Sequence, residues 1–241
     1  VEADVILKNG VLGRAAALQL LGEVEEASAA YEDVLLRNPK DALALNNLML
    51  LYRQMQNSAK LQAVASRLLE QDPGCEAALE ALATTAFGAE EYGAAANACR
   101  MLAGRNPDKL ENWLNLGLCC QKSGMDEEAA EAFEQAVRAD SQSAQARAQL
   151  AWAYQNTGRP REAVAHYLEA WRLDSRMTNA AMNLAAIYEQ LGEPSEAGKV
   201  YERVVEENAE LADAWFRLGC LRFQDSQTQG ARSCFENCVK L

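Results

Sequence analysis

Cysteine is the residue of this chain with the widest chemical range, because its thiolate can bind a metal or enter a disulfide. The seven cysteines are Cys75, Cys99, Cys119, Cys120, Cys220, Cys234 and Cys238. One helical turn separates Cys234 from Cys238, which would place both thiols on one helix face. No CxxC pair occurs and the number is odd, so the pattern indicates neither a zinc site nor a disulfide framework. We therefore expect small buried apolar side chains, no metal site and a reducing, cytoplasmic environment.

The one histidine, His166, limits the catalytic chemistry that the chain can perform. A catalytic triad, a histidine general base and a histidine-rich metal site all need this residue with partners around it. His166 is predicted to face solvent on a helix, next to Tyr167. No GxGxxG, GxxxxGK[ST] or HExxH motif occurs, and acidic pairs such as Glu127 and Glu128 are typical of solvated helix faces. We therefore predict that the chain is not an enzyme and needs no cofactor.

Charge restricts the classes of partner. The chain has 23 Lys and Arg against 35 Asp and Glu, a formal net charge of −12. Nucleic-acid affinity depends on cations that neutralise phosphates, and anionic membranes repel an acidic protein. No apolar run approaches the roughly 18 residues that span a bilayer. Neither nucleic acid nor membrane is therefore expected as a partner.

The composition favours helices as the elements that position the side chains. The 241 residues include 45 alanines but only 14 glycines and 5 prolines, and 49% are hydrophobic. Alanine loses no side-chain entropy in a helix, whereas glycine and proline are the main helix breakers. A β-sandwich or barrel, which needs frequent Gly and Pro turns, is disfavoured, and so is disorder.

Residues of the same type recur every 34 positions along the chain. Leucine occupies one repeat position at Leu48, Leu82, Leu116, Leu150, Leu184 and Leu218. A small residue recurs at Ala95, Ala129, Ala163, Ala197 and Ala231, and an aromatic one at Phe133, Tyr167, Tyr201 and Phe235. After a flank at 1–7, we expect one solenoid over 8–241, with units at 8–41, 42–75, 76–109, 110–143, 144–177, 178–211 and 212–241.

Each unit is predicted to form two helices separated by a turn. Four units carry a glycine fourteen residues after their start, at Gly22, Gly124, Gly158 and Gly192. A glycine there can adopt a positive φ and end the first helix. Two residues later, Pro160 and Pro194 suit the opening of a second helix.

These residues together resemble the tetratricopeptide repeat (TPR) family over essentially the whole chain, most strongly from 110 to 205. The resemblance implies an all-α, right-handed superhelical solenoid of antiparallel helix pairs, with first helices on the concave face and second helices on the convex face. Four residues depart from the family pattern: Arg14 replaces Leu, Gln56 replaces Gly, Leu61 replaces a small residue, and Arg222 replaces Tyr.

Position 6 of each first helix is predicted to face the concave groove. The seven units carry there Gly13, Asn47, Ala81, Asn115, Gln149, Asn183 and Arg217. Four of the seven are amides, which can both donate to and accept from the backbone of an extended peptide. This partial ladder resembles the asparagine ladder in the TPR region of O-GlcNAc transferase.

Apolar side chains are predicted to line the groove beside the amides. They are Leu114, Leu118, Trp152, Met182, Phe216 and Phe223. Apolar walls with a few placed polar groups are typical of peptide sites. Trp152 and Phe216 could alternatively pack between neighbouring first helices. We call Asn47, Asn115, Gln149, Asn183, Arg217, Leu114, Leu118, Trp152, Met182 and Phe216 the predicted groove residues.

One TPR subclass grips the C-terminal carboxylate of heat-shock chaperones. The resemblance to that subclass fails here. Asn183 and Arg217 match its pattern, but Ala148, Trp152 and Asp213 do not, and Asp213 reverses a charge.

The function predicted from the sequence is a cytoplasmic, non-catalytic interaction scaffold. Its partner would be a protein or extended peptide, neutral or basic with apolar anchors. One alternative is the targeting or substrate-recruiting region of a larger enzyme such as a glycosyltransferase. Another is a self-assembling structural scaffold, because no polar cap covers Trp215, Leu218 and Phe235 at the C-terminal end.

Overall fold

The computed structural model describes residues 2–241, with side chains from Gly10 onward. All regular elements of the described chain are α-helices and none is a strand, which confirms the predicted all-α fold. Two compact units divide it, one ending at Pro107 and the other covering Asp108–Leu241. The prediction of one continuous solenoid over 8–241 stays a prediction.

The first unit contains three helical hairpins. Its helices are α1 (Glu2–Leu21), α2 (Val24–Arg37), α3 (Ala42–Gln54), α4 (Ser58–Gln71), α5 (Glu76–Gly88) and α6 (Tyr92–Arg105). Each helix packs against the next along the chain. Helix α1 begins at Glu2, within the segment predicted as a flank, and is longer than the other first helices.

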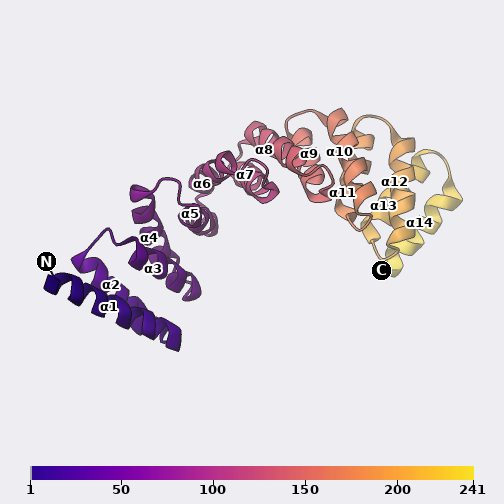
Figure 1. Ribbon diagram of the computed structural model, residues 1–241. Helices are drawn as coiled ribbons and strands as arrows, with labels where there is room; N and C mark the ends of the chain where they lie inside the picture. The colour runs from indigo at the N-terminus through magenta and orange to yellow at the C-terminus, as the bar shows by residue number, and fades with distance from the viewer. Residues whose placement is uncertain (1) are drawn as a thin grey trace. The chain divides into compact units, whose positions relative to one another are not determined.

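The second unit contains four hairpins that follow one another side by side (Figure 1). Its helices are α7 (Leu110–Lys122), α8 (Asp126–Ala139), α9 (Ala144–Asn156), α10 (Pro160–Leu173), α11 (Thr178–Gln190), α12 (Pro194–Glu207), α13 (Ala212–Gln224) and α14 (Thr228–Lys240). Both α10 and α12 open on a proline, where the missing N–H group has no intrahelical partner to lose.

A left-handed residue ends every first helix. The predicted glycines have φ values of 81° at Gly22, 75° at Gly124, 73° at Gly158 and 75° at Gly192. The other three units adopt the same conformation without glycine, at Gln56 (54°), Glu90 (62°) and Ser226 (62°). The hairpin geometry therefore imposes a positive φ on whichever residue stands there, although side chains with a Cβ disfavour it.

Glycine at one of these three positions is expected to stabilise the fold. For Glu90→Gly we expect a gain of about 0.5–1 kcal/mol, because relief of left-handed strain exceeds the extra backbone entropy that glycine loses on folding. Urea denaturation followed by circular dichroism measures the change. The matched control, Gly158→Ala, should lose about 1 kcal/mol for the opposite reason. A loss of stability in Glu90→Gly would contradict the strain argument.

In two repeats, the phenylalanine of the second helix packs against the first helix of its own repeat. Phe133 is fully buried, and a Cβ at Gly117 would clash with its ring. Phe235 likewise lies against Gly219, where a Cβ would come within 2.6 Å of the ring. Glycine in the first helix therefore lets the two helices approach with a phenyl ring between them.

At one pair of equivalent positions, a side chain of a first helix donates a hydrogen bond to a carboxylate of the preceding repeat. Tyr52 donates to Glu32, and Tyr154 donates to Glu134 at 2.9 Å. Arg222 stands where the family pattern has tyrosine, and its Nη2 donates to Glu202 at 2.9 Å. In each case the donor lies 20 residues after the carboxylate. Arg222 thus departs in residue type while keeping the interaction.

Candidate functional site

A cavity of about 460 Å³ lies among α9, α10 and α11 of the second unit. It is lined by Ala148, Gln149, Trp152, Tyr167, Arg176, Met177, Thr178, Asn179, Ala180 and Asn183. Three predicted groove residues, Gln149, Trp152 and Asn183, thus meet around one space although they belong to two repeats. Its volume is within the range of about 300–1,000 Å³ that is typical of ligand pockets.

Asn183 is oriented by a tyrosine at the base of the cavity. Its Nδ2 atom donates to the hydroxyl of Tyr167 at 3.2 Å. Tyr167 is 1% exposed, and burial raises the pKa of its phenol to about 12, so the ring is neutral at physiological pH. With the nitrogen engaged, the amide offers its Oδ1 as a hydrogen-bond acceptor.

Trp152 forms part of the cavity wall and is half-buried. Part of its side chain is therefore accessible from the cavity. Gln149 and Asn183 are also half-buried. Their amides lie in a setting with less competing water than an exposed surface, which strengthens a hydrogen bond to a ligand.

The remaining predicted groove residues lie outside the lining of this cavity. Asn115 is exposed on α7, and Leu118 and Met182 are half-buried. Arg217 is exposed on α13, with Nε 3.7 Å from Oδ1 of Asp213. In the first unit, Asn47 is half-buried on α3.

The apolar members of the predicted set differ in exposure. Phe216 is 49% exposed, with its ring centroid 6.1 Å from that of Phe235, so it offers apolar surface. Leu114 is only 7% exposed. Its inclusion in the groove surface was wrong, because a side chain enclosed by packing has almost no area left for a peptide to contact.

His166 does not face solvent as predicted. It is half-buried, with its ring centroid 5.5 Å from that of Tyr154. The Nδ1 atom is buried and has no hydrogen-bond partner among the described residues. Burial lowers the pKa of the imidazole, so the ring is neutral at pH 7 and packs as an aromatic side chain.

Seven residues of the cavity lining are not among the predicted groove residues. They are Ala148, Tyr167, Arg176, Met177, Thr178, Asn179 and Ala180. In the sequence, Tyr167 stood out only as the recurring aromatic residue of a second helix. Arg176 and Met177 lie in the loop between α10 and α11. Asn179 lies four residues before Asn183 and therefore on the same face of α11. That periodicity is the signal that could have found it.

The described residues contain no cluster of three or more His, Cys, Asp or Glu that could hold a metal ion. Within the same part of the chain, no helix combines the length and the apolar character needed to cross a membrane.

Comparison with known proteins identifies the repeat. The tetratricopeptide repeat family model matches residues 109–217, within the second unit. This segment of the chain belongs to the tetratricopeptide repeat family. No curated protein sequence matches the chain.

Solved structures share the fold of this chain at low sequence identity. A crystal structure of MamA is 19% identical with a TM-score of 0.64, and the match covers 68% of this chain and 90% of MamA. A tetratricopeptide repeat protein from Parabacteroides merdae is 17% identical with a TM-score of 0.58, covering 97% and 92%. A structure of Naa15/Naa10 bound to HypK-THB is 18% identical with a TM-score of 0.71, covering 89% of this chain and 33% of the other.

Proposed function

We propose that this TPR protein is a non-catalytic scaffold that binds an extended peptide segment of a partner protein, with the cavity among α9, α10 and α11 as the central contact. The observation that carries the proposal is the convergence of Gln149, Trp152 and Asn183 around one cavity. Amides beside an aromatic wall combine backbone recognition with a place for an apolar side chain.

The amides suit a peptide ligand because they bind its backbone N–H and C=O groups, which are present whatever the sequence of the peptide. The Oδ1 atom of Asn183, with its amide nitrogen engaged by Tyr167, would accept a backbone N–H. Gln149 has both a donor and an acceptor to offer an adjacent peptide group. The indole of Trp152 and the thioether of Met177 would enclose the intervening side chain.

The partner segment is proposed to be neutral or basic with apolar anchors. The one cation in the cavity lining, Arg176, is bonded through Nε to Asp174 at 3.0 Å. The rest of the lining is uncharged, while the whole chain has a net charge of −12. Such a surface attracts a basic segment at long range and makes no specific demand for an acidic one at contact. A solved structure with a similar fold, Naa15/Naa10, is bound to HypK-THB, and this supports a protein partner for the present chain.

The test starts from a random peptide library displayed on phage and selected against the intact chain. For the tightest selected peptide, Asn115→Ala, Gln149→Ala and Asn183→Ala should each weaken binding about two- to twelvefold, because each lost hydrogen bond costs roughly 0.5–1.5 kcal/mol. Trp152→Ala should cost on the order of 2 kcal/mol as an anchor. Isothermal titration calorimetry measures these affinities.

The control is Gln62→Ala, which removes an exposed amide from the second helix α4 and should leave the affinity unchanged. Melting temperatures of the same variants separate lost binding from lost folding. If the triple amide variant binds the selected peptide as tightly as the wild type, the groove is not the binding site. Selection that yields no peptide would contradict the proposed function as a whole.

A further inference from the structure

Tyr167 has a hydroxyl proton without an acceptor at the cavity among α9, α10 and α11. Its side chain is 1% exposed and lines that cavity. The hydroxyl oxygen accepts a hydrogen bond from Nδ2 of Asn183, and no hydrogen bond of the described residues uses this hydroxyl as a donor. Burial raises the pKa of the phenol to about 12, so the proton is present at physiological pH. A buried polar group normally has a partner, and this one has room for a ligand beside it.

Two tyrosines at the same repeat position donate their hydroxyl proton to the first helix of their own repeat. The bonds run from Tyr31 to Oε1 of Gln19 at 3.0 Å and from Tyr201 to Oε1 of Glu189 at 2.6 Å. The acceptor lies twelve residues before the tyrosine in both. Gln155 stands at the equivalent position before Tyr167, but within the described structure it accepts no hydrogen bond from that hydroxyl. Tyr167 therefore keeps for the cavity a proton that its equivalents use internally.

Asn183 supplies an acceptor beside this donor. Its Nδ2 atom is bonded to the Tyr167 hydroxyl, so Oδ1 of the same amide is the atom left for a ligand. The two residues thus present one neutral donor and one neutral acceptor close together. A carboxylate has only acceptors and an ammonium group only donors, whereas a carboxamide has both. The hydrogen-bonding pattern therefore matches a carboxamide.

The charges around the cavity also favour a neutral ligand group. The lining contains no carboxylate. Its one cation, Arg176, is bonded to Asp174 through Nε at 3.0 Å and through Nη2 at 3.4 Å. A charged ligand group would lose water without gaining a free counter-charge, and this costs more than desolvating a neutral amide. A carboxylate would in addition face Oδ1 of Asn183, one acceptor against another.

The position of the pair distinguishes a side-chain amide from the peptide backbone. In a trans peptide unit the C=O and N–H groups point in opposite directions. A primary carboxamide has its C=O and one N–H on the same edge, so it can meet Tyr167 and Asn183 together. Tyr167 lies at the base of the cavity, which a long side chain can reach while its aliphatic stem lies beside Trp152 and Met177.

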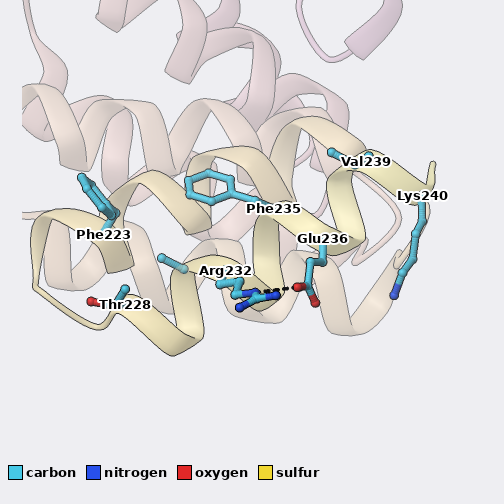
Figure 2. Close-up of a pocket in the computed structure, with 8 residues that line it drawn as sticks. Phe223, Thr228, Arg232, Phe235, Glu236, Val239 and Lys240 are labelled. Atoms are coloured by element: carbon cyan, nitrogen blue, oxygen red, sulfur yellow. Dashed lines mark hydrogen bonds and ion pairs between the residues drawn. The ribbon is translucent and has the colours of Figure 1, made fainter.

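Another cavity of this unit, about 610 Å³ on α13 and α14, is of a different kind. Figure 2 shows Phe235 between Phe223 and Val239, with a dashed line from Arg232 to Glu236. The two charged groups are thus paired with each other. On the preceding hairpins the next helix of the chain packs against the equivalent surface, so the apolar surface here does not indicate a ligand.

We propose that the cavity among α9, α10 and α11 is a pocket for the side-chain carboxamide of a glutamine or asparagine of the bound peptide. The C=O group of this amide accepts from the Tyr167 hydroxyl, and its N–H donates to Oδ1 of Asn183. A carbonyl oxygen can accept two hydrogen bonds, so Oδ1 remains able to bind a backbone N–H as well. The inference rests on the proposed function, because it specifies which side chain of the extended peptide fills the cavity.

The sequences of selected peptides provide the first test. Phage selection against the intact chain should give peptides that share a Gln or Asn at one position. In the tightest peptide, replacing that residue by Glu or Asp of the same length should weaken binding by about tenfold or more, because it introduces an unpaired charge. Isothermal titration calorimetry measures both affinities, and we call their ratio the amide selectivity.

Tyr167→Phe tests the hydroxyl directly. It keeps the ring but removes the donor, so binding of the amide peptide should weaken about two- to twelvefold. The amide selectivity should fall as well, because the released Nδ2 of Asn183 can then donate to a carboxylate. A variant that only loses folded protein would bind both peptides less and keep the same selectivity.

The matched control is Tyr201→Phe, which removes the equivalent hydroxyl outside the cavity. Both the affinity and the amide selectivity of this variant should equal those of the wild type. Circular dichroism checks that each variant is folded at the temperature of the titration.

Three results would overturn the carboxamide pocket. The selected peptides could share no Gln or Asn, they could share Ser or Thr instead, or Tyr167→Phe could keep the full amide selectivity. The proposed function would stand in all three cases if Gln149→Ala and Asn183→Ala still weaken binding. A selection that yields no peptide contradicts the proposed function itself, and this inference with it.

Discussion

Phe133→Ala is expected to lower the free energy of unfolding of the second unit by about 3–5 kcal/mol, the usual cost of removing a buried phenylalanine. The ring is fully buried between the two helices of its hairpin, where it contacts Gly117. Backbone atoms form part of its surroundings, so the helices cannot easily collapse into the space. The loss should therefore lie toward the upper part of that range.

Urea denaturation followed by circular dichroism measures this loss. The matched control is Phe223→Ala, which removes the same side chain from a position that is 65% exposed, and it should change stability by less than about 0.5 kcal/mol. Similar losses for the two variants would show that Phe133 does not pack as described. A loss limited to an early part of the transition would show that the repeats unfold in steps, as in other solenoids.

Alkaline unfolding is expected between pH 10 and pH 12, because buried tyrosines resist ionisation in the folded chain. Burial, with the hydrogen bond to Glu134, raises the pKa of Tyr154 from 10.0 to about 12, and burial raises that of Tyr167 to about 12. The folded chain holds these protons more tightly than the unfolded chain. Their stabilising contribution is therefore complete below pH 10 and is lost as the pH rises towards 12.

The size of this effect follows from the two shifts. At 1.36 kcal/mol per pKa unit, each tyrosine contributes about 2–3 kcal/mol, which is a large share of the stability of a small domain. Burial raises the pKa of Tyr52 and Tyr201 as well, in the same direction. Tyrosinate absorbance and far-ultraviolet circular dichroism should therefore change together in one cooperative step.

Tyr167→Phe provides the control for the alkaline transition. It keeps the ring but removes the ionisable hydroxyl, so the pH dependence of stability above pH 10 should become shallower. The same variant releases the amide of Asn183 and should lower stability modestly at neutral pH. Tyrosine titration near pH 10 with helicity intact would contradict the burial argument.

Several local features follow from the sequence because they depend on residues close together in the chain. Gly124 and Gly158 end their helices with a positive φ as expected, since glycine alone has no Cβ to oppose it. Pro160 opens α10, where its fixed φ suits a first helical residue. The 34-residue spacing predicts paired helices for the same reason, because the turn signals recur at a fixed distance from the apolar positions.

Contacts across repeats required the tertiary structure. Gln149, Trp152 and Asn183 were predicted to face one groove, and they meet at one cavity. Tyr167 completes it from a second helix, which no first-helix periodicity could show. Glu90 adopts a left-handed conformation against its own preference, because the hairpin on either side determines the turn.

The sequence by itself determined the repeat, the all-α fold and the exclusion of the familiar catalytic motifs, since these depend on composition and on short-range spacing. Only the tertiary structure decided which side chains remain accessible. Leu114 is enclosed while Val239 is open, although both are apolar residues on amphipathic helices. Burial depends on which neighbouring helix covers a face, and that is a property of packing between segments rather than of the segment itself.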